Sequence, residues 1–193
     1  RPNIVVVQLE SFFDVNRLKD IEFSENPLPN FTQLSKRCAS GFLSVPVIGA
    51  GTVNSEFEML TGMNIDDFGI GEYPYKTVLK EKTCESLAYN LKSYGYKAYA
   101  VHDHEGSFHE RNLVYPNLGF DVFDSVEYMW PEGYTAMEWS KDSVLTGEIE
   151  KALSATAEKD FVFAVAVQSH GSYPSEPDVE YEHHVTATSS VIE

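Results

Sequence analysis

Several apolar segments of the chain end in side chains that can bind a metal ion or a phosphate group. Glu10 follows the first such segment. His102 and His104 follow a later one, and His170 follows the last. Each of these residues, taken alone, is more often a helix cap, a surface charge or a loop residue bonded to backbone. Because sites in open α/β sheets lie beyond the carboxyl ends of the strands, the group as a whole predicts a metal or phosphate site.

Thr52 is the sharper candidate, because it directly follows the small-residue segment 49–51, Gly-Ala-Gly. Small residues let the backbone approach a ligand closely. A helix that opens at Thr52 offers free N–H groups and a favourable dipole to an anion. A threonine hydroxyl is a weak nucleophile, but a metal ion could hold it as an alkoxide. From the residues alone, a glycine-rich turn followed by an ordinary threonine cap is the commoner explanation, and both interpretations stay open.

The elements that would position these residues alternate between strands and helices. The predicted strands are 4–9, 97–101 and 161–167, and residues 41–47 are expected to be extended. The predicted helices are 29–37, 52–62 with Thr52 as N-cap, 83–95, 111–118 and 140–157. The nearly continuous apolar run 4–9 is typical of a strand covered on both faces. This order predicts an α/β fold, with a mainly parallel sheet sandwiched by helices.

The composition bounds the classes of function. The chain has 193 residues and a formal net charge of -16, which fits one domain and argues against a nucleic-acid partner. An anionic substrate would need local compensation, most simply from a divalent cation. Two cysteines, Cys38 and Cys84, exclude a zinc cluster and leave a single disulfide open. No apolar run is long enough to span a bilayer, so the chain as given is expected to be soluble.

Four motifs together resemble the lipoteichoic acid synthase family of phosphoglycerol transferases, within the alkaline phosphatase and sulfatase superfamily. Residues 2–11 (PNIVVVQLES) are similar to its opening strand, and residues 49–58 (GAGTVNSEFE) to its nucleophile segment. Residues 107–112 (SFHERN) resemble its substrate loop, and residues 169–171 (SHG) its later strand end. The resemblance covers nearly the whole chain, and the motifs are specific in combination.

The resemblance implies a role for each matching residue. Glu10 and Thr52 would bind a divalent metal, Mn²⁺ first and Mg²⁺ or Zn²⁺ as alternatives. Thr52 would also be the catalytic nucleophile that takes up the glycerophosphate group. Arg111 would hold the phosphate, and His170 would contact the substrate.

Two departures from the family pattern alter the expected site. His104 and His109 stand where family members often have an Asp and a Trp, seven and two residues before Arg111. They are therefore expected to contact the substrate, with an altered choice of donor or acceptor. No Asp-His pair follows His170, although the family completes its metal site with one. We expect a catalytic domain cut short, with residues 1–171 as its N-terminal part and 172–193 as a polar loop or partly ordered end.

The implied function is metal-dependent transfer of glycerophosphate from a phospholipid to an envelope polymer or glycolipid, through a phospho-threonine. Family members are anchored by N-terminal membrane helices, which implies a cell-membrane location with the catalytic domain outside the cell. The expected partners are anionic phospholipid and envelope glycopolymer. The alternatives are a phosphoethanolamine transferase, a phosphodiesterase or sulfatase-type hydrolase, and a non-catalytic domain that binds the polymer. A formylglycine sulfatase would need a C/S-x-P-x-R motif, which neither cysteine provides.

Overall fold

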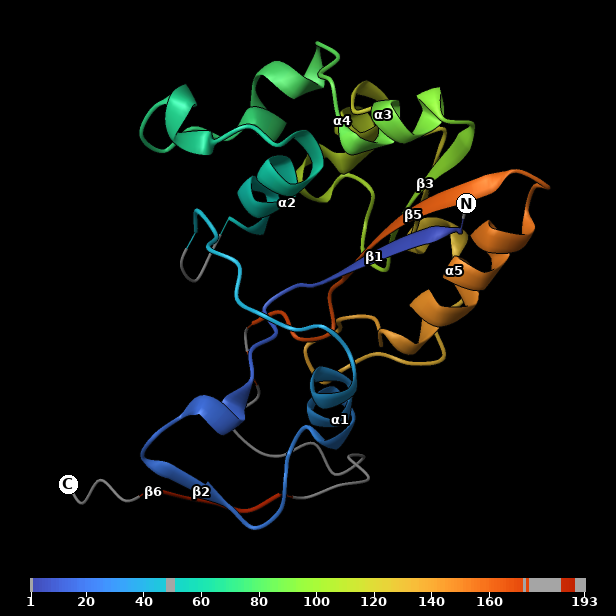
Figure 1. Ribbon diagram of the computed structural model, residues 1–193. Helices are drawn as coiled ribbons and strands as arrows, with labels where there is room; N and C mark the ends of the chain where they lie inside the picture. The colour runs from blue at the N-terminus through green and yellow to red at the C-terminus, as the bar shows by residue number, and fades with distance from the viewer. Residues whose placement is uncertain (1, 48–50, 172, 174–184, 190–193) are drawn as a thin grey trace. The chain divides into compact units, whose positions relative to one another are not determined.

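The computed structural model of the protein describes residues 2–47, 51–171, 173 and 185–189 (Figure 1). It divides into two compact units. The larger unit comprises residues 1–11 and 45–173, and the smaller one comprises residues 12–44 and 174–193. Each unit is described separately below. Within the described residues, no helix combines the length and the apolarity needed to cross a bilayer.

The larger unit is built on a four-stranded parallel sheet. In spatial order its strands are β1 (Ile4–Leu9), β5 (Lys159–Ala166), β3 (Tyr96–His102) and β4 (Val122–Ser125). The predicted mainly parallel sheet is therefore confirmed, and three of its strands lie where the sequence predicts them. Because all four strands are parallel, their carboxyl ends share one edge of the sheet. Glu10 directly follows β1, and His170 lies four residues after the end of β5.

Helices cover both faces of this sheet (Figure 1). On one face lie α2 (Thr52–Thr61), α3 (Leu87–Ser93) and α4 (Arg111–Asn117), whose apolar side chains pack against Phe161 and Phe163 of β5. On the other face, α5 (Ser143–Ser154) packs against Val162 and Ala164 of the same strand. The alternation of β5 side chains between two apolar clusters explains its almost complete burial.

Strand β1 departs from the prediction that it is covered on both faces. Ile4 and Val6 pack into the core shared with α2, α3 and α4. Val5, Val7 and Leu9 point to the other face and are 42, 45 and 45% exposed. The reason is topological: β1 is the edge strand of this sheet, and the cluster around α5 does not reach it.

Several element boundaries also differ from prediction. Gly51, not Thr52, is the N-cap of α2, and it adopts the left-handed conformation with φ 82°. The helix predicted from Thr83 begins at Leu87, because the Ser86 hydroxyl accepts a hydrogen bond from the Tyr89 N–H and caps it there. Strand β4 has no counterpart in the prediction, since its short sequence VFDS carries a weak period-2 signal.

Short 3₁₀ helices connect the main elements of the larger unit. They are η2 (Ile65–Phe68), η3 (Pro74–Lys76), η4 (Val78–Lys80), η5 (Phe108–Glu110) and η6 (Val126–Tyr128). Helix η5 runs directly into α4 and contains His109 at φ 57°, while Glu110 follows at φ 62°. Positive φ is uncommon outside glycine, and two such residues in succession mark a sharply shaped loop before α4.

The smaller unit contains η1 (Val15–Arg17), β2 (Ile21–Phe23), α1 (Pro29–Arg37) and β6 (Ala187–Ser189). Helix α1 spans the predicted residues, and β2 pairs with β6 in an antiparallel ribbon. Most of segment 172–193, expected to be a polar loop, lies outside the described residues, so that expectation stays a prediction. Cys38 and Cys84 are both free thiols.

Candidate active site

The side chains of Glu10 and Thr52 meet at the carboxyl edge of the sheet. Glu10 follows β1 and is 2% exposed, and Thr52 is the first residue of α2. The Thr52 hydroxyl donates a hydrogen bond of 2.6 Å to Oε1 of Glu10. The sequence-based expectation that these two groups lie within reach of a shared cation is therefore confirmed, while their role as metal ligands stays a prediction.

Gly51 holds the start of α2 close to an aromatic side chain. A Cβ atom at this position would lie 2.8 Å from the hydroxyl oxygen of Tyr73. The left-handed φ favours glycine here, and any larger residue would also have to displace the Tyr73 ring. Glycine at position 51 therefore lets the chain turn tightly and deliver Thr52 to Glu10. The preceding residues of the nucleophile segment, 49 and 50, lie outside the described residues.

Glu56 is the polar centre beneath this pair, and its carboxylate is fully buried. It accepts a hydrogen bond from the Tyr115 hydroxyl at 2.9 Å and from the Tyr75 hydroxyl at 3.3 Å. It also accepts from Nε of Arg111 at 3.3 Å, and from a second Arg111 nitrogen in a bidentate ion pair. The sequence analysis did not single out Glu56. Its position four residues after Thr52 on a helix, and so on the same face, was the available signal.

Arg111 is completely buried and links Glu56 to the rest of the site. Its nearest nitrogen lies 3.6 Å from Oε2 of Glu10, and its Nη1 lies 3.0 Å from Nε2 of His102. Burial alone would lower the pKa of Arg111, but the Glu56 carboxylate outweighs burial and raises it, so the guanidinium is charged. The resemblance assigns the phosphate to Arg111, but in this structure two nitrogens of its guanidinium group are paired with Glu56. The phosphate contact of Arg111 therefore stays a prediction.

His102 supports Arg111 as a neutral side chain. Its Nδ1 lies 2.9 Å from the carbonyl oxygen of Val165 on the adjacent strand, so Nδ1 carries the proton and Nε2 accepts from Arg111. Burial, followed by the charge of Arg111, lowers the pKa of His102 well below its usual value. His102 therefore orients the guanidinium without adding a second positive charge.

Three more of the described histidines gather around Phe108. The Phe108 ring centroid lies 4.8 Å from that of His104, 4.4 Å from that of His109 and 6.0 Å from that of His170. Burial lowers the pKa of His104, and burial with Arg111 lowers that of His109 to about 4. These two imidazoles are therefore neutral near pH 7. The structure brings all three predicted substrate-binding histidines together, and their contact with substrate stays a prediction.

Trp139 joins this cluster, although nothing in its sequence context indicated that it would. Its ring centroid lies 4.7 Å from that of His170 and 5.1 Å from that of His104. Its indole N–H is buried without a hydrogen-bond partner. Trp139 comes from the loop before α5, so only the tertiary fold places it between two strand ends.

The oxygen atoms of Glu10 and Thr52 are of the chemical types that a divalent cation binds. Oε2 of Glu10 is buried and accepts no hydrogen bond from a described residue, and the Arg111 guanidinium, 3.6 Å away, is the cationic group beside it. A carboxylate and a hydroxyl oxygen are ligands that hard ions such as Mg²⁺ and Mn²⁺ prefer. Among the described residues, no group of three or more His, Cys, Asp or Glu side chains is arranged to hold a metal. Glu10 and Thr52 would thus supply only part of a coordination shell, and their role as ligands stays a prediction.

A buried carboxyl, Asp103, lies beside this site at the end of β3. Asp103 is 0% exposed, and neither of its oxygens accepts a hydrogen bond from a described residue. Asp142 faces it and accepts from the N–H groups of Val167 and Gln168 at 3.2 and 2.9 Å. Burial, and then the charge of Asp142, raises the pKa of Asp103 to about 8. Asp103 is therefore protonated at neutral pH.

The raised pKa of Asp103 predicts that stability falls as pH rises. The folded state retains a proton that the unfolded chain loses near pH 4, so the contribution is fully present below pH ~4. It is lost progressively up to about pH 8, where the folded group also ionises. Asp103→Asn should flatten this part of the profile, measured by urea unfolding at a series of pH values. The assignment would be wrong if the free energy of unfolding of the parent rose with pH over this range and Asp103→Asn abolished that rise.

Comparison with known proteins places this geometry in a family. The Sulfatase family model matches residues 2–191. A protein of Rhizobium meliloti (strain 1021), assigned to cyclic beta-1,2-glucan modification, is 34% identical over 173 residues, which are 90% of this chain and 26% of that protein. The chain thus spans about a quarter of the length of this relative.

Solved structures share the fold at lower identity. The lipoteichoic acid synthase LtaP from Listeria monocytogenes has a TM-score of 0.72 at 23% identity, over 88% of this chain and 41% of that one. The Streptococcus pyogenes phosphoglycerol transferase GacH, in complex with sn-glycerol-1-phosphate, has a TM-score of 0.77 at 21% identity, over 100% and 50%. An alkaline phosphatase superfamily protein from Vibrio parahaemolyticus gives 0.69 at 21%, over 96% and 46%. The chain belongs to the sulfatase family, and its sheet and helices have the alkaline phosphatase/sulfatase-like fold seen in lipoteichoic acid synthase-like phosphoglycerol transferases.

Proposed function

We propose that the protein transfers a glycerophosphate group, or a related phosphoryl alcohol, from a phospholipid to a cell-envelope glycan. The reaction would pass through a phosphodiester on Thr52 and would depend on a divalent cation, with Mn²⁺ as the first candidate and Mg²⁺ or Zn²⁺ as alternatives. The catalytic domain would act on the outer side of the cell membrane, where both the lipid donor and the glycan acceptor are available.

The observation that carries this proposal is the contact between Thr52 and Glu10. The hydroxyl is at the first residue of a helix, where free N–H groups favour negative charge on an incoming phosphate. Its hydrogen bond to Oε1 of Glu10 directs the hydroxyl proton at a carboxylate. The other oxygen of Glu10 is buried, accepts no hydrogen bond from a described residue and lies 3.6 Å from a nitrogen of Arg111. A nucleophile, an acceptor for its proton and a second carboxylate oxygen that could bind a metal therefore lie together.

In the first half of the reaction, Thr52 takes the place of diacylglycerol on phosphorus. A cation held by Glu10 and Thr52 would supply the positive charge that favours the ionised hydroxyl. The bond between Thr52 Oγ1 and phosphorus forms as the bond from phosphorus to the diacylglycerol oxygen breaks. That oxygen takes up a proton, for which His170 is the proposed donor. Diacylglycerol leaves and a glycerophosphoryl-threonine remains.

In the second half, a hydroxyl of the acceptor replaces Thr52. Its proton would pass to His170, which gave one up in the first half, and its oxygen bonds to phosphorus as the bond from phosphorus to Thr52 Oγ1 breaks. Thr52 Oγ1 then takes back the proton accepted by Glu10. Arg111 supplies positive charge next to the phosphate site, held in place by Glu56 and His102. His104 and His109, neutral at pH 7, would donate to or accept from hydroxyl groups of the substrate.

The names of the similar proteins support the donor and acceptor classes. LtaP is described as a lipoteichoic acid synthase, and GacH as a phosphoglycerol transferase in complex with sn-glycerol-1-phosphate. The Rhizobium protein is assigned to the modification of a cyclic glucan. The GacH name supports glycerophosphate as the transferred group, and the Rhizobium name supports a glucan as the molecule that is modified. Sulfate ester hydrolysis through formylglycine is not proposed, because the chain lacks the C/S-x-P-x-R motif that it requires.

Trapping the intermediate tests the proposal. The full-length protein would be incubated with phosphatidylglycerol and Mn²⁺ without acceptor, then quenched and digested for mass spectrometry. We expect a glycerophosphoryl adduct on the peptide that contains Thr52, together with released diacylglycerol, and the loss of both when a chelator removes the cation. An adduct formed only from phosphatidylethanolamine would identify a phosphoethanolamine transferase. Diacylglycerol release without any adduct on Thr52 would refute the threonine mechanism.

A further inference from the structure

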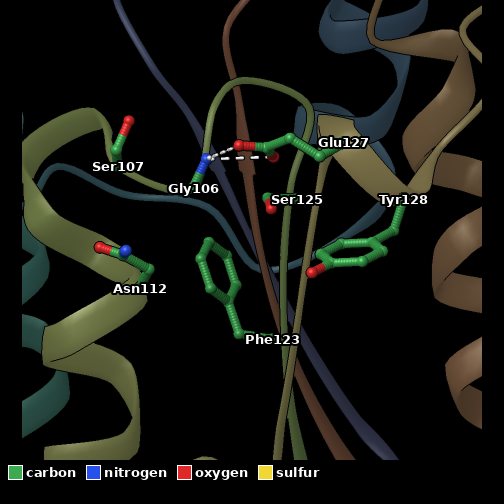
Figure 2. Close-up of a pocket in the computed structure, with 7 residues that line it drawn as sticks. All are labelled: Gly106, Ser107, Asn112, Phe123, Ser125, Glu127 and Tyr128. Atoms are coloured by element: carbon green, nitrogen blue, oxygen red, sulfur yellow. Dashed lines mark hydrogen bonds between the residues drawn. The ribbon is translucent and has the colours of Figure 1, made fainter.

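A cavity separate from the site at Thr52 lies at the carboxyl edge of the same sheet, at the end of β4. It has a volume of about 340 Å³, which is at the lower end of the range of small-molecule sites. Figure 2 shows its lining, in which the rings of Phe123 and Tyr128 and the polar side chains of Asn112 and Glu127 surround a common space. None of the residues singled out for the phosphotransfer reaction lines it.

Loop residue Gly106 forms one wall of this cavity and is fixed in place. Its N–H donates to both oxygens of the Glu127 carboxylate, at 3.0 and 3.2 Å (Figure 2). A Cβ atom at this position would lie 2.8 Å from the hydroxyl oxygen of Ser125 and 3.3 Å from the ring of Phe123. A larger residue here would have to displace side chains of β4, so the loop passes close to the strand. The cavity is therefore formed by tight packing of the loop on the strand end.

The charge of the lining argues against a phosphate ligand. Glu127 is the one charged residue among those that line the cavity, and no Lys, Arg or His is among them. Burial raises the pKa of Glu127, but hydrogen bonds from Ser125 and from backbone N–H groups outweigh burial and lower it. The carboxylate is therefore ionised and can accept hydrogen bonds from hydroxyl groups, while it repels an anion.

The aromatic residues add flat apolar surface next to these polar groups. The Tyr128 side chain lines the cavity although the residue is 70% exposed, so its ring is open to a ligand from solvent. Trp130, two residues further along, is 86% exposed. A flat ring face beside hydrogen-bonding groups suits a ligand with an apolar C–H face and a rim of hydroxyls. A pyranose ring has both.

We propose that this cavity binds one uncharged sugar ring of the glycan acceptor. The proposal deepens the proposed function and rests on it for the identity of the acceptor, whereas sugar binding itself can be measured independently. Asn112 and Glu127 would bond the sugar hydroxyls, and Tyr128 would cover the face of the ring. Helix α4 supplies a residue to each site, since Arg111 and Asn112 are its first two residues.

The position along the sheet indicates which sugar would occupy the cavity. Glu10 follows β1 and the cavity lies at the end of β4, three interstrand spacings away in the order β1-β5-β3-β4. At about 4.8 Å a spacing, the two are separated by roughly 14 Å. A single sugar whose hydroxyl reacts at Thr52 could not fill the cavity as well. The occupant is therefore another ring of the same oligosaccharide, which makes the cavity a secondary acceptor subsite.

Calorimetric titration with neutral cyclic β-1,2-glucan tests this subsite. We expect the full-length protein to bind the glucan, and Tyr128→Ala and Asn112→Ala each to raise the Kd about tenfold, equivalent to about 1.4 kcal/mol. Tyr94→Ala is the matched control, because Tyr94 is 64% exposed and lies at the C-cap of α3; its Kd should equal that of the parent. In transfer assays Tyr128→Ala should raise the KM for glucan, with diacylglycerol release in the absence of acceptor unchanged.

Three results would overturn the subsite. The first is that glucan does not bind the parent protein. The second is that glucan binds Tyr128→Ala and Asn112→Ala as tightly as it binds the parent. The third is that sn-glycerol-1-phosphate binds the parent in place of glucan and loses affinity in Tyr128→Ala. The proposed function fails separately. A protein that binds glucan through Tyr128 but forms no adduct on Thr52 would retain the sugar subsite and lose the phosphotransfer mechanism.

Discussion

Thr52→Ala is expected to abolish glycerophosphate transfer, with turnover reduced by roughly 10³- to 10⁶-fold, the loss seen when a nucleophile that acts as part of a unit is removed. The substitution deletes the oxygen that would bond to phosphorus and also the hydrogen bond to Oε1 of Glu10. Release of diacylglycerol from phosphatidylglycerol in the presence of Mn²⁺ provides the measurement.

Two control variants separate chemistry from folding. Thr52→Ser keeps a hydroxyl at the helix start and should retain measurable turnover. Ser55→Ala, one turn further along α2, removes a hydroxyl outside the proposed site and should leave turnover near that of the parent. If Thr52→Ala retains turnover within about tenfold of the parent, equivalent to about 1.4 kcal/mol, Thr52 is not the nucleophile.

The apolar pattern of the sequence was sufficient to predict most of the larger unit. Runs such as 161–167 become β5 because a strand buried on both faces is apolar at nearly every position. The pattern failed at β1, whose run 4–9 is equally apolar while alternate residues are exposed. A strand at the edge of a sheet can carry the same residues as a central one, so strand order decides burial and periodicity alone does not.

The candidate site could be predicted only in part for a similar reason. Glu10, His104 and His170 follow strands, and the convergence of parallel strand ends brings them to one edge. Glu56 and Trp139 reach that edge by other routes, one from inside a helix and the other from the loop before α5. Their roles depend on side-chain contacts between elements distant in sequence. No local pattern encodes such contacts.

The buried charges at the site are linked to one another, and this linkage has consequences for stability. Arg111 lies between the carboxylates of Glu56 and Glu10, and it faces the neutral imidazole of His102. Negative charge thus exceeds positive charge in a region closed to solvent, with Oε2 of Glu10 left without a hydrogen bond. A cation at Glu10 would relieve this excess. Cation binding is therefore expected to raise the stability of the fold as well as to permit catalysis.

Glu56→Gln is expected to lower the free energy of unfolding by about 3–5 kcal/mol, the usual cost of removing one partner from a buried ion pair. The amide keeps the shape of the side chain and can still accept a hydrogen bond from Tyr115, so the loss arises mainly from the guanidinium of Arg111. That charge is 0% exposed and would retain only Glu10, at 3.6 Å, as a counter-charge. Chemical denaturation at neutral pH measures the difference.

A second substitution shows whether the loss of stability comes from an unpaired buried charge or from a general packing defect. Glu56→Gln with Arg111→Met removes the charge that the single variant leaves unpaired, so the double variant should be more stable than Glu56→Gln alone. Glu81→Gln, on an exposed position, should stay within about 0.5 kcal/mol of the parent. A double variant less stable than Glu56→Gln would show that Arg111 stabilises the fold through its contacts with His102 and Phe108, and that Glu56 is not the group that makes its burial tolerable.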